Sequence, residues 1–151
     1  MKIYCEHGAL TPQIRKLGRS GRTKVVHFPY DPDSRSRHIS SMARPSNARI
    51  RDLNLPIKDL PGAIADYSGS CHFDEILSVL GREHRRDALH VDSAFKSGCS
   101  AFITQDSDIL KHRARLEGLL GIRFFHPDAD LSDLDQFIAG DSGCASGEGA
   151  S

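Results

Sequence analysis

The sequence predicts an α/β protein, built as a three-layer α/β/α sandwich around a mostly parallel sheet. Short apolar runs typical of strands alternate with stretches of helical periodicity along most of the chain. The 151 residues suffice for one compact domain of ordinary size but not for two. With 38% hydrophobic and 26% charged residues, the chain is polar for a globular protein, yet its composition argues against wholesale disorder.

The N-terminal part predicts a strand, a helix and a second strand. Residues 2–5 (KIYC) form a short β-type run. Thr11 followed by Pro12 is typical of a helix N-terminus, and we expect this helix to end near Gly18. Residues 23–28 (TKVVHF) predict the second strand. The chain therefore begins with a βα unit that leads into another strand.

The C-terminal half alternates helices and strands more clearly. Its strongest helix has Val91, Ala94 and Phe95 on one apolar stripe, with His90 and Asp92 at the edges of that stripe. The other elements follow from the same patterns. We expect helices over 73–80, 82–97, 107–119 and 131–139, and strands over 100–104 and 122–125.

We expect a single domain over residues 1–139. Within it, residues 31–47 are rich in Ser, Arg and Pro and predict a long basic loop. Residues 140–151 are mostly Gly, Ser and Ala and predict a disordered tail. No apolar stretch approaches the roughly 18 residues that a membrane span needs, and the start has no signal-peptide core. We therefore expect a cytoplasmic protein without membrane attachment.

Charges are balanced overall but unevenly distributed. Between Gln13 and Arg51 there are ten basic and two acidic residues, a local charge of +8, whereas the residues after Arg123 include six acidic ones and no Lys or Arg. Clustered Lys and Arg bind phosphates, so the basic region indicates a polyanion-binding surface. An ordinary solvated surface is the alternative. The candidate nucleic-acid contacts are the arginines in and just after the predicted loop, namely Arg35, Arg37, Arg44 and Arg49.

Acidic residues follow two of the predicted strands. Glu6 comes directly after the first strand, and Asp106 and Asp108 follow the third. Ligands of open α/β sheets bind beyond the carboxyl ends of the strands, so these acids meet in one crevice if the two strands are parallel neighbours. Asp87 lies on the apolar stripe of the strongest helix, where a buried charge needs a compensating cation.

Carboxylates that converge on one crevice predict a divalent-cation site. Hard oxygen donors suit Mg²⁺ or Mn²⁺, and such ions stabilise the charge that builds on a phosphodiester during hydrolysis. Each acid also has a structural alternative. Asp106 suits a helix N-cap, Asp108 suits the dipole of the same helix, and Asp87 suits an ion pair with an arginine. The candidate partners for such an ion pair are Arg82, Arg86 and Arg115.

The four cysteines are scattered along the chain. Free thiols are favoured over disulfides, and Cys5 and Cys99 lie in or beside apolar strand-like runs, where a cysteine acts as a small buried side chain. A zinc site formed by Cys71, His84 and His90 is the alternative, although their spacing fits no common zinc motif. That alternative predicts stoichiometric zinc in the purified protein.

The segment 87–110 resembles the C-terminal half of PIN domains, a family of metal-dependent nucleases that includes many bacterial toxin ribonucleases. In that family, a helix with an Asp and a small-residue face leads through a glycine turn into a strand that ends in Thr-x-Asp, followed by a second Asp. Thr104, Asp106 and Asp108 match this ending. The start of the chain also resembles the family's first strand, with Glu6 where the family normally has Asp.

The resemblance implies a divalent-metal-dependent ribonuclease that hydrolyses phosphodiester bonds in RNA, with DNA as the other candidate substrate. It makes Glu6, Asp87, Asp106 and Asp108 the metal-binding and catalytic acids. Thr104 would orient an acid or a bound water. The resemblance further implies a homodimer and an antitoxin-like protein partner that blocks the cleft.

Two departures from the family pattern leave an alternative open. Glu6 is one methylene longer than the usual Asp, and residues 34–51 contain no acid where the family usually has one. Asp74 or Glu75 is the candidate substitute. The alternative is a catalytically degenerate PIN-like domain that binds nucleic acid or an acidic protein partner.

Overall fold

The computed structural model describes residues 1–27, 46 and 72–143. In this part of the chain, four parallel strands form one sheet in the order β2-β1-β3-β4. The fold class is α/β with a parallel sheet, as the sequence predicts. The strands are β1 (Lys2–Cys5), β2 (Lys24–Val26), β3 (Ala101–Ile103) and β4 (Arg123–Phe125).

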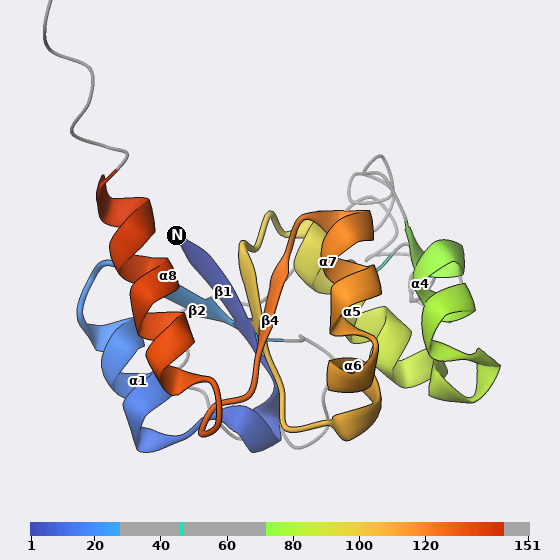
Figure 1. Cartoon of the computed structure of the whole chain (residues 1–151), viewed down its shortest axis with the longest axis horizontal. Coiled ribbons are helices and arrows are strands. Elements are labelled where there is room, and N and C mark those ends of the chain that lie inside the picture. Colours follow the sequence, from blue (N-terminus) through green and yellow to red (C-terminus); the bar gives the residue numbers. More distant parts are fainter. Residues whose placement is uncertain (28–45, 47–71, 144–151) are drawn as a thin grey trace, which may run out of the picture.

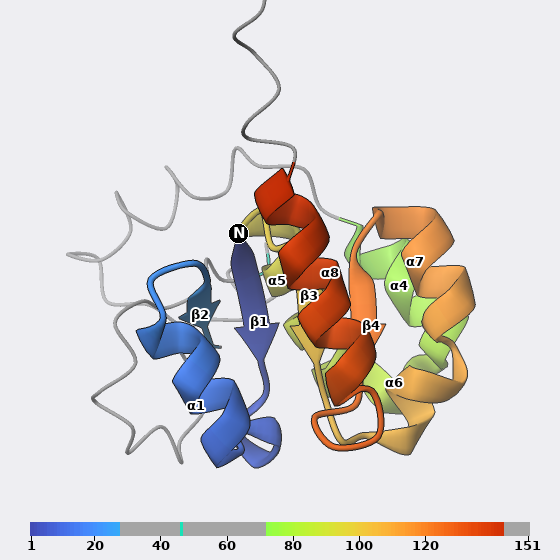
Figure 2. The same cartoon turned by 60° about the vertical axis from the view of Figure 1, so that its left-hand side comes forward.

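Helices cover both faces of this sheet and complete a three-layer α/β/α sandwich. Helices α1 and α8 lie on one face, and α4, α5, α6 and α7 lie on the other (Figure 1). The same two layers are seen from another side in Figure 2. The helices are α1 (Pro12–Arg19), α4 (Phe73–Leu80), α5 (Arg85–Lys96), α6 (Ser107–Lys111), α7 (Arg113–Leu120) and α8 (Leu131–Gly143), with 3-10 turns η1 (His7–Ala9) and η3 (Arg82–His84).

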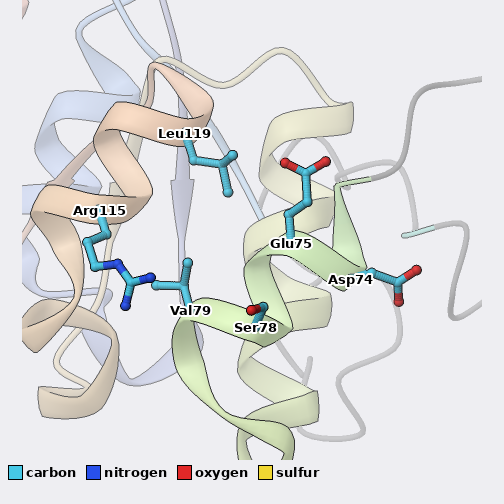
Figure 3. A pocket seen from close by; sticks show the side chains of 6 residues that line it. All are labelled: Asp74, Glu75, Ser78, Val79, Arg115 and Leu119. Carbon is cyan, nitrogen blue, oxygen red and sulfur yellow. The ribbon is translucent and has the colours of Figure 1, made fainter.

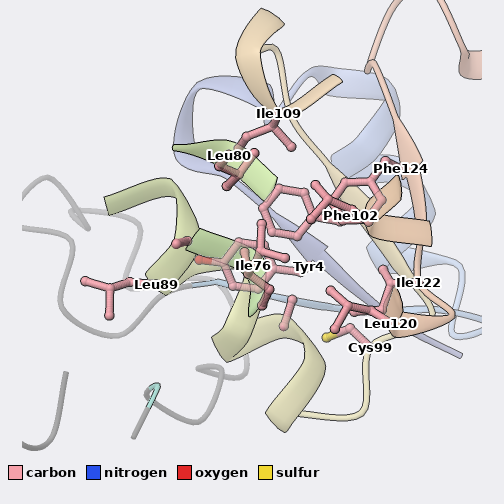
Figure 4. Packing of buried hydrophobic residues seen from close by; sticks show 14 of the residues in the cluster. Tyr4, Ile76, Leu80, Leu89, Cys99, Phe102, Ile109, Leu120, Ile122 and Phe124 are labelled. Atoms are coloured by element: carbon pink, nitrogen blue, oxygen red, sulfur yellow. The ribbon is translucent and has the colours of Figure 1, made fainter. Parts of the chain in front are cut away.

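Alternation along the strands divides the interior into two cores. Tyr4, Phe102 and Phe124 stack on the face that α4, α5, α6 and α7 cover, with neighbouring ring centroids 4.8 and 5.2 Å apart (Figure 4). Successive side chains of a strand point to opposite faces. Glu6 is two positions after Tyr4, and Thr104 is two positions after Phe102. Both therefore point toward the same face of the sheet as these aromatic rings.

Several predicted helix boundaries differ from the observed ones. The helix expected over 107–119 is two helices, because the chain bends at His112 (φ −100°, ψ 8°), whose N–H bonds to carbonyls three and two residues back. The predicted helix over 82–97 begins as the 3-10 turn η3 before α5. The helix expected over 131–139 continues to Gly143. The spacing of apolar residues shows which face of a helix is buried, but it does not show where the helix axis changes direction.

Helix α5 is more deeply buried than the sequence predicts. His90 and Asp92, expected at the edges of an apolar stripe, are both buried. The Asp92 side chain is fully enclosed and accepts hydrogen bonds from the Ser46 hydroxyl (2.5 Å) and from the backbone N–H of His72 (3.0 Å). Asp92 is buried at the edge of the stripe because residues from outside α5, Ser46 and His72, cover it there.

Some predictions concern residues outside the described part of the chain. Apart from Ser46, these include the predicted basic loop, the residues after Gly143, and the candidate nucleic-acid contacts Arg35, Arg37, Arg44 and Arg49. Among the helices that are described, none combines the length and the apolar character needed to cross a membrane.

Candidate active site

Pairing of β1 with β3 brings Glu6 next to Thr104. The two strands are parallel neighbours, and Cys5 lies in register with Ile103. The backbone N–H of Glu6 continues the ladder by donating to the Ile103 carbonyl at 3.1 Å. The condition that the two strands are parallel neighbours is therefore met, and the two residues that follow them meet at the carboxyl edge of the sheet.

Thr104 connects two of the candidate acids through one hydroxyl group. The Thr104 hydroxyl donates a hydrogen bond to Oε2 of Glu6. The hydroxyl oxygen, Oγ1 of Thr104, also accepts a hydrogen bond from the backbone N–H of Asp106 at 2.9 Å. The Thr104 side chain is fully buried, so water does not compete for these bonds. Thr104 consequently orients the Glu6 carboxylate and holds the start of the loop that carries Asp106.

Asp106 caps helix α6, as one structural alternative predicts. Its Oδ1 accepts hydrogen bonds from the backbone N–H groups of Asp108 (2.8 Å) and Ile109 (3.2 Å). Capping occupies Oδ1 and leaves Oδ2 without a hydrogen bond among the described residues. Asp108 lies in the first turn of α6 with a side chain that is 55% exposed, at the rim of the group.

Asp87 lies in the first turn of α5 with its side chain 23% exposed. Its Oδ2 is 3.2 Å from Nδ1 of His84. Arg82, Arg86 and Arg115 are all described, and none of them forms an ion pair with Asp87. The partner of this carboxylate is therefore a histidine rather than one of the predicted arginines.

Electrostatics place these acids in one neighbourhood. Burial raises the pKa of Glu6 to about 7, the Thr104 hydrogen bond lowers it, the charges of Asp87 and Asp106 raise it, and the charge of Arg86 lowers it. Burial also raises the pKa of Asp87, and the charge of Asp106 adds to that rise. The carboxylates that follow β1, begin α5 and cap α6 thus lie close enough together for their charges to interact.

The carboxylate oxygens of Glu6, Asp87 and Asp106 are ligands of the kind that a hard divalent cation prefers, but they do not surround a common point as they stand. Within the described residues, no three His, Cys, Asp or Glu side chains are arranged to hold a metal ion as they stand. One oxygen each of Glu6, Asp87 and Asp106 is taken by a hydrogen bond within the protein. The second oxygen of each makes no hydrogen bond within the described chain, so each acid keeps one hard oxygen donor open to a ligand.

Neither candidate substitute for the missing family acid joins this crevice. Asp74 and Glu75 line a pocket of about 590 Å³ between α4 and α7, together with Leu119 (Figure 3). Leu119 lies in the last turn of α7, just before β4 begins. That pocket is therefore near the amino ends of the strands, on the side away from Glu6.

The zinc alternative gains no support from the described residues. Burial raises the pKa of Cys5 and of Cys99 to about 12, so both thiols stay protonated and behave as the small buried side chains that the sequence predicts. Nδ1 of His90 is hydrogen-bonded to the Tyr4 hydroxyl, and Nδ1 of His84 is hydrogen-bonded to Asp87, so these two ring nitrogens already have partners. Cys71 lies outside the described residues.

Two residues of this region have contacts other than those that the sequence predicts. His84, a candidate zinc ligand, contacts Asp87 three positions later. Arg86, a candidate partner of Asp87, lies where its charge lowers the pKa of Glu6. The His-x-x-Asp spacing at the start of a helix could have identified the first contact, because residues three apart are neighbours on a helix.

Comparisons of the chain with protein-family models, with characterised proteins and with solved structures yield no match. The interpretation of the crevice therefore depends on its own residues and geometry.

Proposed function

We propose that this protein is a PIN-like, divalent-metal-dependent nuclease that hydrolyses RNA. The observation that carries the proposal is the convergence of Glu6, Asp87 and Asp106, from three distant segments, on the carboxyl edge of a parallel sheet. Their mutual repulsion is unfavourable unless a cation or protons neutralise it. Ligand sites of open α/β sheets lie at this edge.

The acids have distinct roles in this proposal. Glu6, Asp87 and Asp106 would hold Mg²⁺ or Mn²⁺, with Asp108 as a further acid at the rim. The bound ion supplies charge neutralisation, a lowered pKa for a bound water, and stabilisation of negative charge on the phosphate. Thr104 keeps the Glu6 carboxylate oriented whether or not substrate is present, since its hydroxyl is buried and bonded on both sides.

Substrate phosphates need positive charge beside this acidic crevice. Arg86, in the first turn of α5, is close enough for its charge to lower the pKa of Glu6. We propose that it contacts a phosphate of the bound strand, together with the basic region of the N-terminal half. An RNA substrate in turn suits a cytoplasmic location.

The resemblance to toxin ribonucleases adds two partners to the proposal. A homodimer would bring two crevices into one assembly. An antitoxin-like protein would inhibit by covering the carboxyl edge of the sheet, where the acids lie.

Cleavage of labelled RNA tests the proposed activity. The wild-type protein should degrade RNA with Mn²⁺ or Mg²⁺ and not with EDTA. Asp106→Asn should lose roughly 100-fold or more of the rate, the scale on which loss of one electrostatic contact at a reacting group acts. Asparagine caps helices as well as aspartate does, so this variant should keep the fold and remove only the charge.

Asp133→Asn is the matched control, because Asp133 is an exposed acid in the first turn of α8 on the opposite face of the sheet. It should cleave at the wild-type rate. Equal cleavage by Asp106→Asn and wild type would contradict the catalytic assignment. If neither protein cleaves and both bind RNA with a steep salt dependence, the degenerate binding domain is the correct alternative.

A further inference from the structure

His84 begins helix α5 at a position that a glycine turn determines. Gly81 has φ +103°, a conformation that side chains other than glycine rarely adopt, and its carbonyl accepts a hydrogen bond from the His84 N–H at 3.0 Å. The 3-10 turn between them leads into α5, where His84 is the N-cap residue and its side chain is 24% exposed. The ring is thus held beside Asp87, which lies in the first turn of α5.

The imidazole lies between acids from two different elements. Its Nδ1 is 3.2 Å from Oδ2 of Asp87 on α5 and 4.0 Å from Oδ2 of Asp108 on α6. Nε2 is 3.7 Å from Oε1 of the exposed Glu83. The shortest of these contacts is a hydrogen bond, and it is the one that the Asp87 carboxylate makes within the described chain.

Glu6, Asp87 and Asp106 are each held by a different kind of donor. Thr104 provides a hydroxyl for Glu6, and the first turn of α6 provides backbone N–H groups for Asp106. For Asp87 the donor is the imidazole of His84, the N-cap residue of α5, whose side chain makes no capping hydrogen bond. Carboxylates and histidines that bind metals are commonly oriented by such outer hydrogen bonds, whose loss weakens metal binding about 10- to 100-fold.

We propose that His84 is a positioning residue of this site: its Nδ1–H holds Oδ2 of Asp87, so that Oδ1 is the atom presented to the cation. The inference rests on the proposed function and adds a residue outside the acid set. His84 would not itself bind the ion. Without it, the Asp87 carboxylate would rotate freely, and each bound ion would have to order it again.

Mn²⁺ affinity, measured by isothermal titration calorimetry, tests this role on the full chain. His84→Ala should weaken Mn²⁺ binding about 10- to 100-fold. His84→Asn keeps an N–H donor near the position of Nδ1 and should recover most of that loss. The same order should appear in kcat for RNA cleavage, with KM for RNA little changed, because the histidine acts on the acid and not on the substrate.

His72→Ala is a matched control for a general effect of losing a histidine. His72 also lies at a helix start, and its Nδ1 is 3.3 Å from Oε1 of Glu75, again three residues later. Its side chain is 29% exposed, close to the value for His84. His72→Ala should bind Mn²⁺ as the wild type does. If it weakens binding as much as His84→Ala, the effect of His84 is not specific to the site.

Electron spin-echo spectroscopy of the Mn²⁺-loaded protein gives a readout that does not depend on affinity. We expect no nitrogen coupling, because the histidine stays outside the coordination sphere. Nitrogen coupling that disappears in His84→Ala would overturn the inference by making His84 a ligand. Unchanged Mn²⁺ affinity in His84→Ala would overturn it as well.

The two proposals fail in distinguishable ways. If the wild type binds Mn²⁺ and cleaves RNA while His84→Ala matches it in both, the positioning role is wrong and the nuclease assignment stands. If the wild type binds no Mn²⁺, the nuclease assignment is wrong and the inference about His84 falls with it.

Discussion

Thr104 donates a hydrogen bond to the carboxylate of Glu6 across two parallel strands whose residues are 98 positions apart. The contact depends on the order of the sheet, because β1 lies directly between β2 and β3. It is buried, and its oxygen also accepts from the N–H of Asp106. The Thr104 hydroxyl therefore couples the position of the Glu6 carboxylate to that of the loop that carries Asp106.

Thr104→Val should destabilise the protein by about 1–3 kcal/mol, because it removes the donor to Glu6 and the acceptor for a backbone N–H while conserving shape. Loss of the hydrogen bond should also move the pKa of Glu6 above about 7. Urea unfolding and NMR titration of the Glu6 carboxyl measure the two effects. Thr104→Ser keeps the hydroxyl and should show little of either; equal behaviour of the two variants would contradict this role of Thr104.

Stability of the metal-free protein should depend on pH through Glu6. Its pKa in the folded state, about 7, lies above the ordinary 4.5. Its stabilising contribution is therefore fully present below pH 4.5 and is lost as the pH rises through 7. Relative to Glu6→Gln, the wild type should lose up to about 3 kcal/mol of unfolding free energy over this interval. Urea unfolding in EDTA at pH 4.5 and pH 8 measures the difference; a constant difference would contradict the burial of an ionisable Glu6.

Asp92→Ala should cost roughly 2–4 kcal/mol of unfolding free energy, because it leaves the Ser46 hydroxyl and the His72 N–H without their carboxylate acceptor. Asp92→Asn keeps an acceptor oxygen and should cost less. Thermal and urea unfolding measure both. Asp135→Ala, an exposed acid of α8, should stay within about 0.5 kcal/mol of wild type. An Asp92→Ala protein as stable as this control would show that the buried contacts contribute nothing.

Mn²⁺ should raise the melting temperature of the wild type by roughly 5–10 °C at a concentration about 100 times its Kd, since a ligand of the folded state stabilises by mass action. The rise should be reversed by EDTA. It should be much smaller for Glu6→Gln and Asp106→Asn, which each remove one charge from the crevice. Differential scanning fluorimetry gives the comparison, and equal shifts in all three proteins would place the ion elsewhere.

The fold class could be predicted from local patterns, whereas a shared edge for Glu6 and Asp106 could be predicted only on the condition that their strands are parallel neighbours. Strand-type runs ended in Cys5 and Thr104; Glu6 comes directly after the first run, and Asp106 comes two residues after the end of the second. Parallel neighbouring strands then require those acids to share an edge. The apolar stripe of α5 likewise indicated that Asp87 is partly enclosed.

Other features depend on contacts between distant segments or on backbone direction, which spacing does not encode. Asp92 is buried because Ser46 and the backbone of His72 reach it from elsewhere in the chain. The apolar spacing over 107–119 runs on through His112, so it does not indicate that two helices meet there. The role of His84 depends on the turn at Gly81, where a left-handed backbone conformation sets the direction of α5.

Crystals of the protein soaked in Mn²⁺, with anomalous diffraction data, test the central claim most directly. The account predicts one strong anomalous peak about 2.0–2.3 Å from carboxylate oxygens of Glu6, Asp87 and Asp106, with Thr104 still bonded to Glu6. No peak at this edge, with the three carboxylates keeping only their present hydrogen bonds, would contradict it.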